Sequence, residues 1–198
     1  MRYLVVFAHP DPDSFSATLC RAAVDSLREA GHHVDLIDLY TDDFDPRMTT
    51  AERRAYESPT PILSAQIDVY ADLVRQAQGL VFVYPTWWWG LPAILKGWLD
   101  RVLVPGVSFV LDPKTNKVKP GLNHLRHVVG ITTYGSSRTA MRVFNDGGRR
   151  NIMRCVRVLA PPVRCRGQWL GMYDLDRSTP EGRTAFLATV STSMRAGR

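Results

Sequence analysis

The chain is poor in cysteine, and the few it has are not arranged for a structural role. Its 198 residues include three cysteines, Cys20, Cys155 and Cys165. They are odd in number and form no Cys-x-x-Cys pair, which argues against a disulfide framework or a zinc ribbon. We therefore expect reduced cysteines that serve packing, and no metal site.

Long apolar runs are also missing. No stretch approaches the roughly 20 residues that a membrane helix requires. The first apolar run, Tyr3 to Ala8, is too short for a signal peptide and ends at His9-Pro10. We expect a soluble, cytoplasmic protein without membrane insertion. At this length we also expect one domain, residues 1–198, that buries roughly 70% of the surface of the unfolded chain.

The basic residues form no tract, although the formal net charge is +6. They occur singly or in pairs such as Arg53-Arg54 and Arg149-Arg150, and over much of the chain they alternate with acids. This pattern is typical of a solvated enzyme surface, so we expect no nucleic-acid partner. A positive field would also favour ligands that carry phosphate.

Apolar strand patterns alternate with helical patterns along the chain. The predicted strands are 3–8, 33–39, 79–84, 127–132 and 163–169, and the predicted helices are 14–30, 91–103, 179–193 and segments within 62–77 and 139–159. Gly31 is expected to close the first helix. The alternation predicts an α/β fold, a doubly wound five-stranded parallel sheet with helices on both faces. Two segments lie outside the repeat: 40–61, and 105–122 with a turn at 113–117.

Ligands of such sheets bind beyond the carboxyl ends of the strands. The first strand-end loop, residues 9–16, has neither a Gly-x-Gly-x-x-Gly nor a Gly-x-x-x-x-Gly-Lys pattern, so it supports neither a dinucleotide-type loop nor a P-loop. It offers His9, the hydroxyls of Ser14 and Ser16, and the amides of a helix N-terminus, which together suit a phosphate. Ser14 would also serve as an ordinary N-cap.

The second strand-end loop carries three consecutive tryptophans, Trp87 to Trp89, of the five in the chain. Neighbouring side chains leave the backbone in different directions, so at least one indole should be exposed and provide a bed for a planar ligand. The alternative is that all three pack under a loop or a second subunit. The third loop, Thr132 to Ser137, offers amides and hydroxyls for the polar edge of a heterocycle. The phosphate-binding groups of the first loop, the aromatic surface of the second and the polar groups of the third together suit a flavin.

These residues resemble the flavodoxin-like NAD(P)H:quinone oxidoreductases, the DT-diaphorase family. The resemblance rests on Ala8-His9 with Ser14-Phe15, Phe82 to Pro85 with Trp88, Gly90-Leu-Pro-Ala-Ile-Leu-Lys-Gly-Trp98 with Asp100-Arg101, and Thr132-Thr133 with Gly135. Asp38-Leu-Tyr40 with Phe44-Asp-Pro46 is similar to the bacterial branch. Matches span most of residues 4–137, whereas the last sixty residues match only in general pattern.

The resemblance implies a flavodoxin-like fold, a bound flavin and a homodimer. FAD is the expected cofactor, with FMN as the alternative, and NADPH or NADH would reduce a quinone by two electrons in a ping-pong cycle. The flavin phosphate would contact His9, Ser14, Phe15 and Ser16, and the ring would contact Pro85, Thr86, Trp87, Trp88, Trp89, Thr132, Thr133, Tyr134 and Gly135. Lys96, Trp98 and Asp100 are expected to be structural.

The chain departs from the family pattern at two places. Ser16 stands where long family members have Asn, and the Tyr and His that assist those members have no counterparts after Ser137. Tyr134 is the candidate proton donor. Three other functions stay open: a one-electron carrier, which the basic charge fits poorly, a regulatory flavoprotein of an ion-efflux system, and an azo or nitro reductase.

Overall fold

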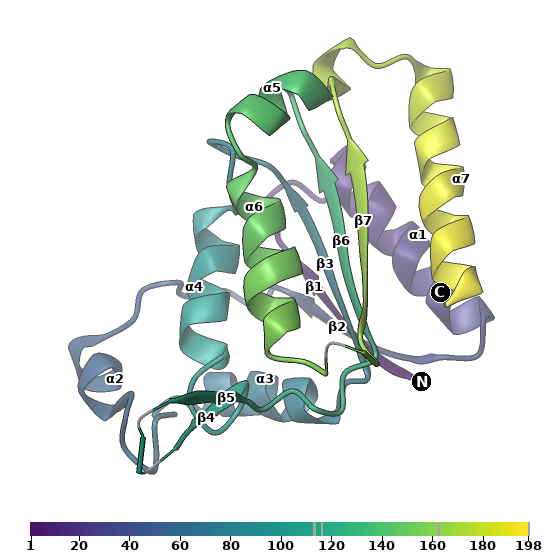
Figure 1. The fold of residues 1–198 in the computed structure, drawn as a ribbon. Helices are drawn as coiled ribbons and strands as arrows, with labels where there is room; N and C mark the ends of the chain where they lie inside the picture. Colours follow the sequence, from purple (N-terminus) through teal and green to yellow (C-terminus); the bar gives the residue numbers. More distant parts are fainter. Residues whose placement is uncertain (113, 116, 162, 198) are drawn as a thin grey trace.

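The computed structural model describes residues 1–112, 114, 115, 117–161 and 163–197, and a parallel sheet forms its centre (Figure 1). The strands are β1 Arg2–Phe7, β2 His33–Asp38, β3 Gly79–Pro85, β6 His127–Thr133 and β7 Arg166–Met172, and they lie in the order β2-β1-β3-β6-β7. The chain adds β2 on one side of β1 and β3 on the other, so its winding reverses between β1 and β3. This confirms the predicted doubly wound, five-stranded α/β fold.

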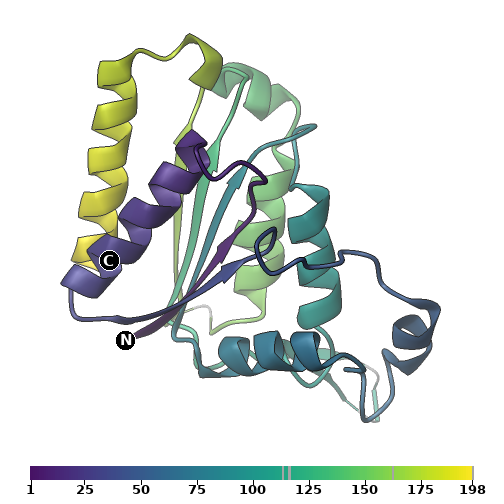
Figure 2. The same ribbon diagram turned by 180° about the vertical axis from the view of Figure 1, so that it is seen from behind.

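Helices cover both faces of the sheet (Figures 1 and 2). One face carries α1 Phe15–Glu29 and α7 Pro180–Ala196, the other carries α3 Ala65–Gln76, α4 Ala93–Val102 and α6 Gly147–Arg150, and α5 Arg138–Val143 lies at the carboxyl ends of the strands. Successive residues of a strand point to opposite faces. Accordingly Tyr3 and Val5 pack in the core under α1 and α7, whereas Leu4 and Val6 pack in the core under α3 and α4.

The ends of α1 follow the expected capping pattern. Ser14 accepts a hydrogen bond from the Ala17 N–H at 3.1 Å, and Gly31 follows the C-cap with a φ of 78°. A side chain with a Cβ would be strained at that φ, so glycine suits the position. The cysteine in this helix, Cys20, is buried, and burial raises the pKa of its thiol to about 12. Cys165 is also buried, whereas Cys155 is exposed.

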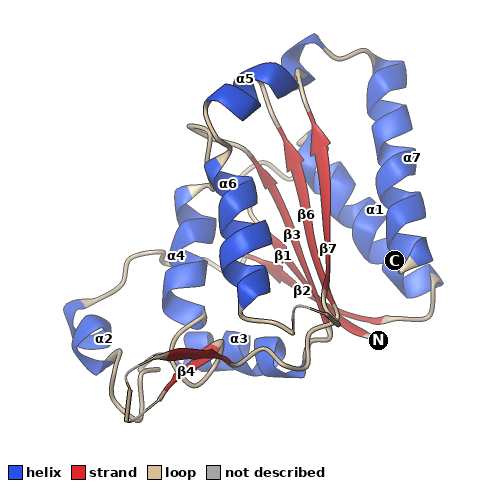
Figure 3. Cartoon of the chain, in the orientation of Figure 1, coloured by secondary structure: helices blue, strands red, loops and turns tan. Residues whose placement is uncertain are grey.

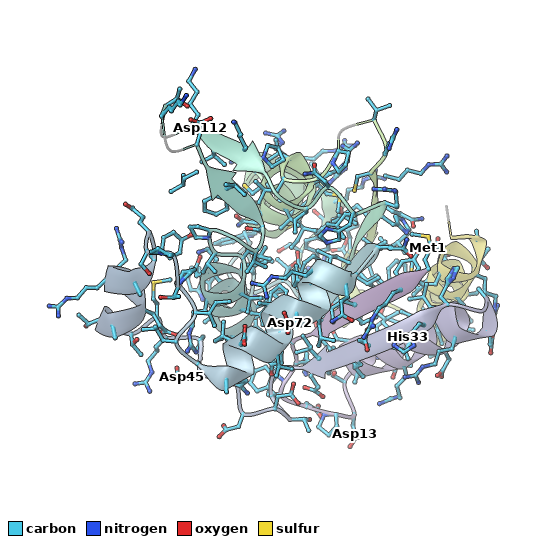
Figure 4. All side chains as sticks on the ribbon, turned by 90° about the horizontal axis from the view of Figure 1, so that it is seen from below. Met1, Asp13, His33, Asp45, Asp72 and Asp112 are labelled. Atoms are coloured by element: carbon cyan, nitrogen blue, oxygen red, sulfur yellow. The ribbon has the colours of Figure 1, made fainter. Side chains whose placement is uncertain are left out.

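The two segments outside the repeat form small elements at the amino-end side of the sheet. One contains α2 Thr50–Ala55, whose N-terminus is closed by a reciprocal cap between Thr49 and Glu52. The other contains an antiparallel pair, β4 Phe109–Leu111 and β5 Val118–Pro120, and Figure 4 shows Asp112 at its outer tip. The turn predicted at 113–117 includes Pro113 and Asn116, which lie outside the described residues.

The segment Gly90 to Trp98 with Asp100-Arg101, on which the resemblance partly rests, builds the contact between α4 and the segment before α2. Trp98 is fully buried, and a Cβ on Gly97 would lie 2.3 Å from the carbonyl oxygen of Pro46. Arg101 forms a salt bridge of 2.6 Å with Glu52 and also donates to the backbone oxygen of Asp45. We call Pro46, Glu52, Gly97, Trp98 and Arg101 the α4 anchor.

Lys96 and Asp100 lie beside the α4 anchor and pair with each other along the helix at 2.5 Å. Arg101 therefore reaches across to α2 and does not pair with its neighbour in sequence. The motif has a structural explanation, as expected, because its glycine allows close backbone approach and its charges are paired.

Several element boundaries differ from the sequence expectation, and two of the differences bear on the site. β7 begins at Arg166 instead of residue 163, and the helix expected within 139–159 is divided into α5, α6 and a π-helical turn, Asn151–Val156. The division occurs at Asn145, whose φ is 61°, and at Asp146, whose carboxylate caps the Arg149 N–H at 2.9 Å. The sequence does mark this break, because residues 145–148 are Asn-Asp-Gly-Gly, a run of turn-forming residues.

In the part of the chain that the structure describes, no helix is both long enough and apolar enough to cross a membrane.

Candidate functional site

Twelve of the thirteen predicted ligand residues line two adjoining hollows at the carboxyl edge of the sheet, the upper end of the strands in Figure 3. The first, the α1 hollow, has a volume of about 320 Å³ and is lined by His9, Ser14, Phe15, Ser16, Pro85, Thr86, Trp87, Thr133, Gly135, Leu175 and Asp176. The second, the tryptophan hollow, has a volume of about 270 Å³ and is lined by Thr86, Trp88, Trp89, Tyr134, Gly135, Ser136 and Met141. Thr132 is the predicted residue that lines neither.

The α1 hollow presents hydrogen-bond donors to a ligand. Within the described residues, the backbone N–H groups of Phe15 and Ser16 have no acceptor, because they belong to the first turn of α1 and Ser14 caps Ala17 instead. His9 Nδ1 lies 3.0 Å from the Asp11 nitrogen and 3.1 Å from the Asp11 oxygen, and these contacts hold the ring at the hollow. These groups and the positive end of the helix suit a phosphate.

The tryptophan loop is a tight two-residue turn. Trp87 and Gly90 exchange backbone hydrogen bonds of 3.3 and 3.0 Å, and the two residues between them, Trp88 and Trp89, have φ values of 48° and 53°. Positive φ at both central positions is the feature of a type I′ turn, for which Asn-Gly is preferred. Two bulky aromatic residues in this conformation are strained, and such strain gathers at functional sites.

The three indoles of this loop face different surroundings. Trp88 is 90% exposed, which confirms that at least one indole is left uncovered. Trp89 packs against Phe144, with ring centroids 4.4 Å apart, and Trp87 turns toward the α1 hollow near His9. The loop therefore offers aromatic surface to both hollows.

The third loop is held in place by internal hydrogen bonds. The hydroxyls of Thr132 and Thr86 lie 2.9 Å apart, and the Thr86 N–H donates to the Thr133 oxygen at 2.8 Å. The Thr133 hydroxyl lies 3.4 Å from that of Ser16. The Thr132 side chain is therefore engaged by the neighbouring loop, whereas Gly135 lines both hollows.

Tyr134 has a buried hydroxyl that is already occupied. It donates to Asp146 at 2.6 Å and accepts from the Trp169 indole N–H at 3.1 Å, and its ring stacks on Tyr173 at 4.5 Å. Burial and the Asp146 carboxylate raise the pKa of Tyr134 well above its ordinary value. The neutral phenol therefore holds Asp146 in place, and its role as a proton donor stays a prediction.

A third hollow adjoins the other two and was not expected from the sequence. This arginine hollow has a volume of about 440 Å³, lies between α5, α6 and the π-helical turn, and shares Met141 with the tryptophan hollow. Its basic lining consists of Arg138, Arg142, Arg149, Arg150 and Arg154. The available signal was composition, because residues 138–166 contain eight arginines and a single acid, Asp146.

Leu175 and Asp176 were also missed. They follow β7, and the strand was expected to end at residue 169, so its true carboxyl end was not recognised as a fourth strand-end loop. The assembled site can hold an anion at the start of α1 beside a flat apolar ligand. The donor amides and the aromatic surface fit the phosphate and the ring of a flavin.

Comparison with known proteins points in the same direction. A family model described as flavodoxin-like fold matches residues 1–153. A ribosyldihydronicotinamide dehydrogenase-like protein of Penicillium crustosum is 38% identical over 133 residues, 59% of this chain and 49% of that protein. An uncharacterized NAD(P)H oxidoreductase of Haemophilus influenzae is 31% identical over 157 residues, 79% of this chain and 74% of that protein.

Solved structures extend the similarity to the full fold. An NAD(P)H:quinone oxidoreductase from Methanothermobacter marburgensis superposes with a TM-score of 0.83 at 24% identity, over 100% of this chain and 99% of that one. The first curated relatives are longer, and the chain spans about half of their length.

Proposed function

Because the chain belongs to the flavodoxin-like fold family, we propose that it is a flavin-dependent oxidoreductase that transfers a hydride from NADPH or NADH to a quinone. The observation that carries this proposal is the junction of two hollows. The α1 hollow and the tryptophan hollow share Thr86 and Gly135, so unpaired amides and a broad aromatic surface belong to one continuous site. The proposal takes residues 1–198 as one domain.

The proposed cofactor is FAD, with FMN as the alternative. The amides of Phe15 and Ser16, with His9 and the Ser14 cap, would hold its phosphate. The loops 85–89 and 132–135 would enclose the ring between them. One flavin-containing neighbour supports the fold of this site: an FMN-dependent NADH-azoreductase from Bacillus anthracis, described in complex with FMN, superposes with a TM-score of 0.74 at 18% identity. Bound flavin supplies reversible hydride chemistry.

The net reaction moves a hydride from the reduced nicotinamide and a proton from water to the quinone, which leaves as a hydroquinone. The residues of the site contribute position and exclusion of water. Trp88 and Trp89 form one apolar wall, and the Thr86–Thr132 and Tyr134–Asp146 hydrogen bonds keep the opposite loops from moving. One slot for both substrates implies that the reductant leaves before the quinone enters, which is a ping-pong cycle.

We extend the proposal to a homodimer. Trp88 is 90% exposed, and the neighbouring Val143 and Phe144 are 76% and 52% exposed. A surface with this much apolar area favours association, and a second copy would cover the strained loop and close the slot.

The reductant can be of two chemical classes. Curated relatives are named for ribosyldihydronicotinamide, which carries no phosphate, or for NAD(P)H, which does. Either class can deliver a hydride to a bound flavin, so the proposed chemistry is the same for both.

Azo reduction is a second candidate. An azoreductase from Bacillus anthracis superposes with a TM-score of 0.79 at 18% identity. The open tryptophan hollow would admit a flat azo compound as readily as a quinone, since its walls are aromatic and apolar.

The test is an absorbance titration of the purified protein with FAD and with FMN, followed by NADPH without oxygen and then a benzoquinone. The expected result is a bound flavin whose band near about 450 nm bleaches and then recovers by two electrons per quinone. Replacement of the quinone by an azo dye distinguishes the second candidate. Failure to bind either flavin would overturn the proposal, and a bound flavin that no reductant bleaches would leave a carrier or regulator.

Trp88→Ala sharpens this experiment because Trp88 contributes little to folding. The affinity of this variant for flavin or its quinone turnover should fall at least tenfold, whereas its thermal stability should stay unchanged. Val163→Ala is the matched control, since Val163 is 95% exposed and lines none of the three hollows. Equal flavin retention and turnover in both variants would contradict the assigned site.

A further inference from the structure

The arginine hollow gathers five cations without acidic partners. Arg138 and Arg142 come from α5, Arg149 and Arg150 from α6, and Arg154 from the π-helical turn. All are exposed, and none forms a salt bridge with an acid in the described part of the chain. Arg138 and Arg142 stand four residues apart on one helix, an arrangement in which like charges repel.

The one acid beside these cations is already engaged. Asp146 accepts the Tyr134 hydroxyl and caps the Arg149 N–H, so its carboxylate faces the protein on both oxygens. Elsewhere in the molecule acids do meet arginines, as in Arg2–Asp35, Arg75–Asp72 and Arg195–Glu29. Other exposed arginines, such as Arg28 and Arg54, also form no salt bridge in the described part of the chain, and the hollow differs from them because five such arginines line one concave surface.

The same segment accounts for the charge of the whole chain. Residues 138–166 hold eight arginines and one aspartate, a net charge of +7, whereas the chain as a whole carries +6. The rest of the chain, outside residues 138–166, is therefore close to neutral. Five of these eight arginines line the hollow, and concave positive surfaces concentrate anionic ligands.

The hollow is connected to the proposed ring site. Both are lined by Met141, and the Gly147 N–H donates to the Trp89 oxygen at 2.9 Å. Phe144 packs on Trp89 from the end of α5. A group held by the arginines would therefore belong to a ligand that also reaches the tryptophan hollow.

The way in which the three hollows adjoin one another indicates which ligand the arginines bind. The α1 hollow, with its phosphate-binding amides, joins the tryptophan hollow through Thr86 and Gly135, and the arginine hollow joins it through Met141. The cofactor phosphate has its own site in the α1 hollow, so a second anionic site on another side of the ring bed serves the second ligand.

We propose that the arginine hollow binds the phosphates of the nicotinamide reductant and makes the enzyme selective for NADPH over NADH and over phosphate-free dihydronicotinamides. This inference rests on the proposed function. NADPH carries about four negative charges, from a diphosphate and a 2′-phosphate monoester. Five guanidinium groups around a volume of about 440 Å³ match this charge and provide forked donors for phosphate oxygens.

The first test is equilibrium binding, which needs no turnover. Isothermal titration of the flavin-loaded protein compares NADP⁺, NAD⁺ and adenosine 2′,5′-bisphosphate at low and high salt. NADP⁺ and the bisphosphate, with about four phosphate charges each, should bind more tightly than NAD⁺ with about two, and binding should weaken with salt. In Arg142→Gln/Arg149→Gln the affinity for adenosine 2′,5′-bisphosphate should fall at least tenfold.

The matched control is Arg28→Gln/Arg54→Gln. It removes the same formal charge from exposed positions that line none of the three hollows, so it separates a local site from the overall field. Its affinity for the bisphosphate should stay within twofold of the parent protein. Arg138→Gln/Arg154→Gln is a second test pair from the same hollow, for use if the first pair fails to fold.

The second test is a ratio of rates. We expect kcat/KM for NADPH divided by kcat/KM for N-ribosyldihydronicotinamide to fall at least tenfold in the hollow variants and to hold in the control. An unchanged ratio and unchanged bisphosphate affinity would overturn the inference. A loss confined to an anionic acceptor such as anthraquinone-2-sulfonate would also overturn it, because the arginines would then serve the acceptor.

The two proposals can fail separately. If no reductant bleaches the flavin, the proposed function fails, while the titration with adenosine 2′,5′-bisphosphate still decides whether the hollow binds phosphate. If NADPH and the phosphate-free reductant bleach the flavin equally well, the oxidoreductase proposal holds and the selectivity fails.

Discussion

The α4 anchor and the arginine hollow both contain arginine on a helix, and they use it in opposite ways. Arg101 in the anchor has a side chain only 9% exposed, pairs with Glu52 and lies over the Phe44 ring at 5.4 Å. Arg142 in the hollow is exposed and has no acidic partner among the described residues. The charge in the anchor is satisfied within the fold, whereas the charge in the hollow is available to a ligand.

The two regions also differ in how well their sequence suits the conformation of their backbone. The anchor uses Gly97 where Pro46 approaches closely, so its sequence agrees with its geometry. The tryptophan loop beside the hollow places Trp88 and Trp89 at positive φ, where its sequence conflicts with its geometry. Local conflict of this kind is expected at functional sites, since stability there is given up for ligand contact.

The largest effect should come from breaking the anchor. Gly97→Val would place side-chain atoms within the backbone of Pro46, and a rigid contact of this kind should cost roughly 4 kcal/mol or more. Urea unfolding of the flavin-free protein measures the loss. Gly182→Ala in α7 is the control, because its new Cβ would meet its nearest neighbour at an ordinary 3.5 Å. A loss at Gly97 no greater than at Gly182 would show that the anchor is not rigid.

The second effect tests the buried charge pair. Burial by itself would raise the pKa of Glu52, but hydrogen bonds from Thr49 and from Arg101 lower it below the ordinary value. Glu52→Gln keeps the cap, since glutamine also serves in a capping box, but leaves Arg101 unpaired. We expect a loss of about 2 kcal/mol at pH 7.

The pH dependence of that loss follows from the direction of the pKa shift. A lowered carboxyl pKa stabilises the fold above its unfolded value of about 4.3, and the contribution disappears as the pH falls through the lower folded pKa. The gap between parent and Glu52→Gln should therefore close below about pH 4. Arg47→Gln, which removes an exposed partner of Asp45, is the control and should show no gap at any pH. A gap for Glu52→Gln that stays constant down to pH 3 would rule out the ion pair as its source.

The smallest effect on stability has the opposite sign. Trp88→Asn with Trp89→Gly gives the turn its preferred residues and removes two strained positions, worth about 1–2 kcal/mol each before the contact with Phe144 is lost. We expect a net gain of roughly 1 kcal/mol together with a large loss of flavin affinity. Thermal unfolding and flavin titration of the same sample measure both. A less stable variant would show that the tryptophans support the fold.

Much of the fold was predictable because its elements are locally consistent. Continuous apolar runs such as Gly79 to Tyr84 identified the buried strands, and Ser14 and Gly31 marked the ends of α1 to within one residue. β7 was misplaced by three residues because polar residues and glycines interrupt its apolar positions, so no continuous apolar run marks either end of the strand. Its register is set by pairing with β6, where Arg166 lies opposite His127.

The candidate site was predictable to the extent that it follows strand ends. The loops after β1, β3 and β6 were recognised because their residue types suit a phosphate, a ring and a polar edge. The loop after β7 was not, since the strand boundary was wrong by three residues. Thr132 was assigned to the ligand from its type, but its hydroxyl is directed to Thr86 across two strands, a pairing that only the sheet creates.

The sequence by itself determined the order of strands and helices, the loops that line the α1 and tryptophan hollows, and the exposure of at least one tryptophan. These features depend on periodicity and on neighbours a few residues apart, which local chemistry controls. The tertiary structure alone decided that five arginines spread over 17 residues meet around one hollow. That convergence depends on the break at Asn145 and Asp146, where a positive φ and a capping carboxylate turn α6 back against the tryptophan loop. Contacts between distant segments set this geometry, and charge spacing along the chain contains no record of it.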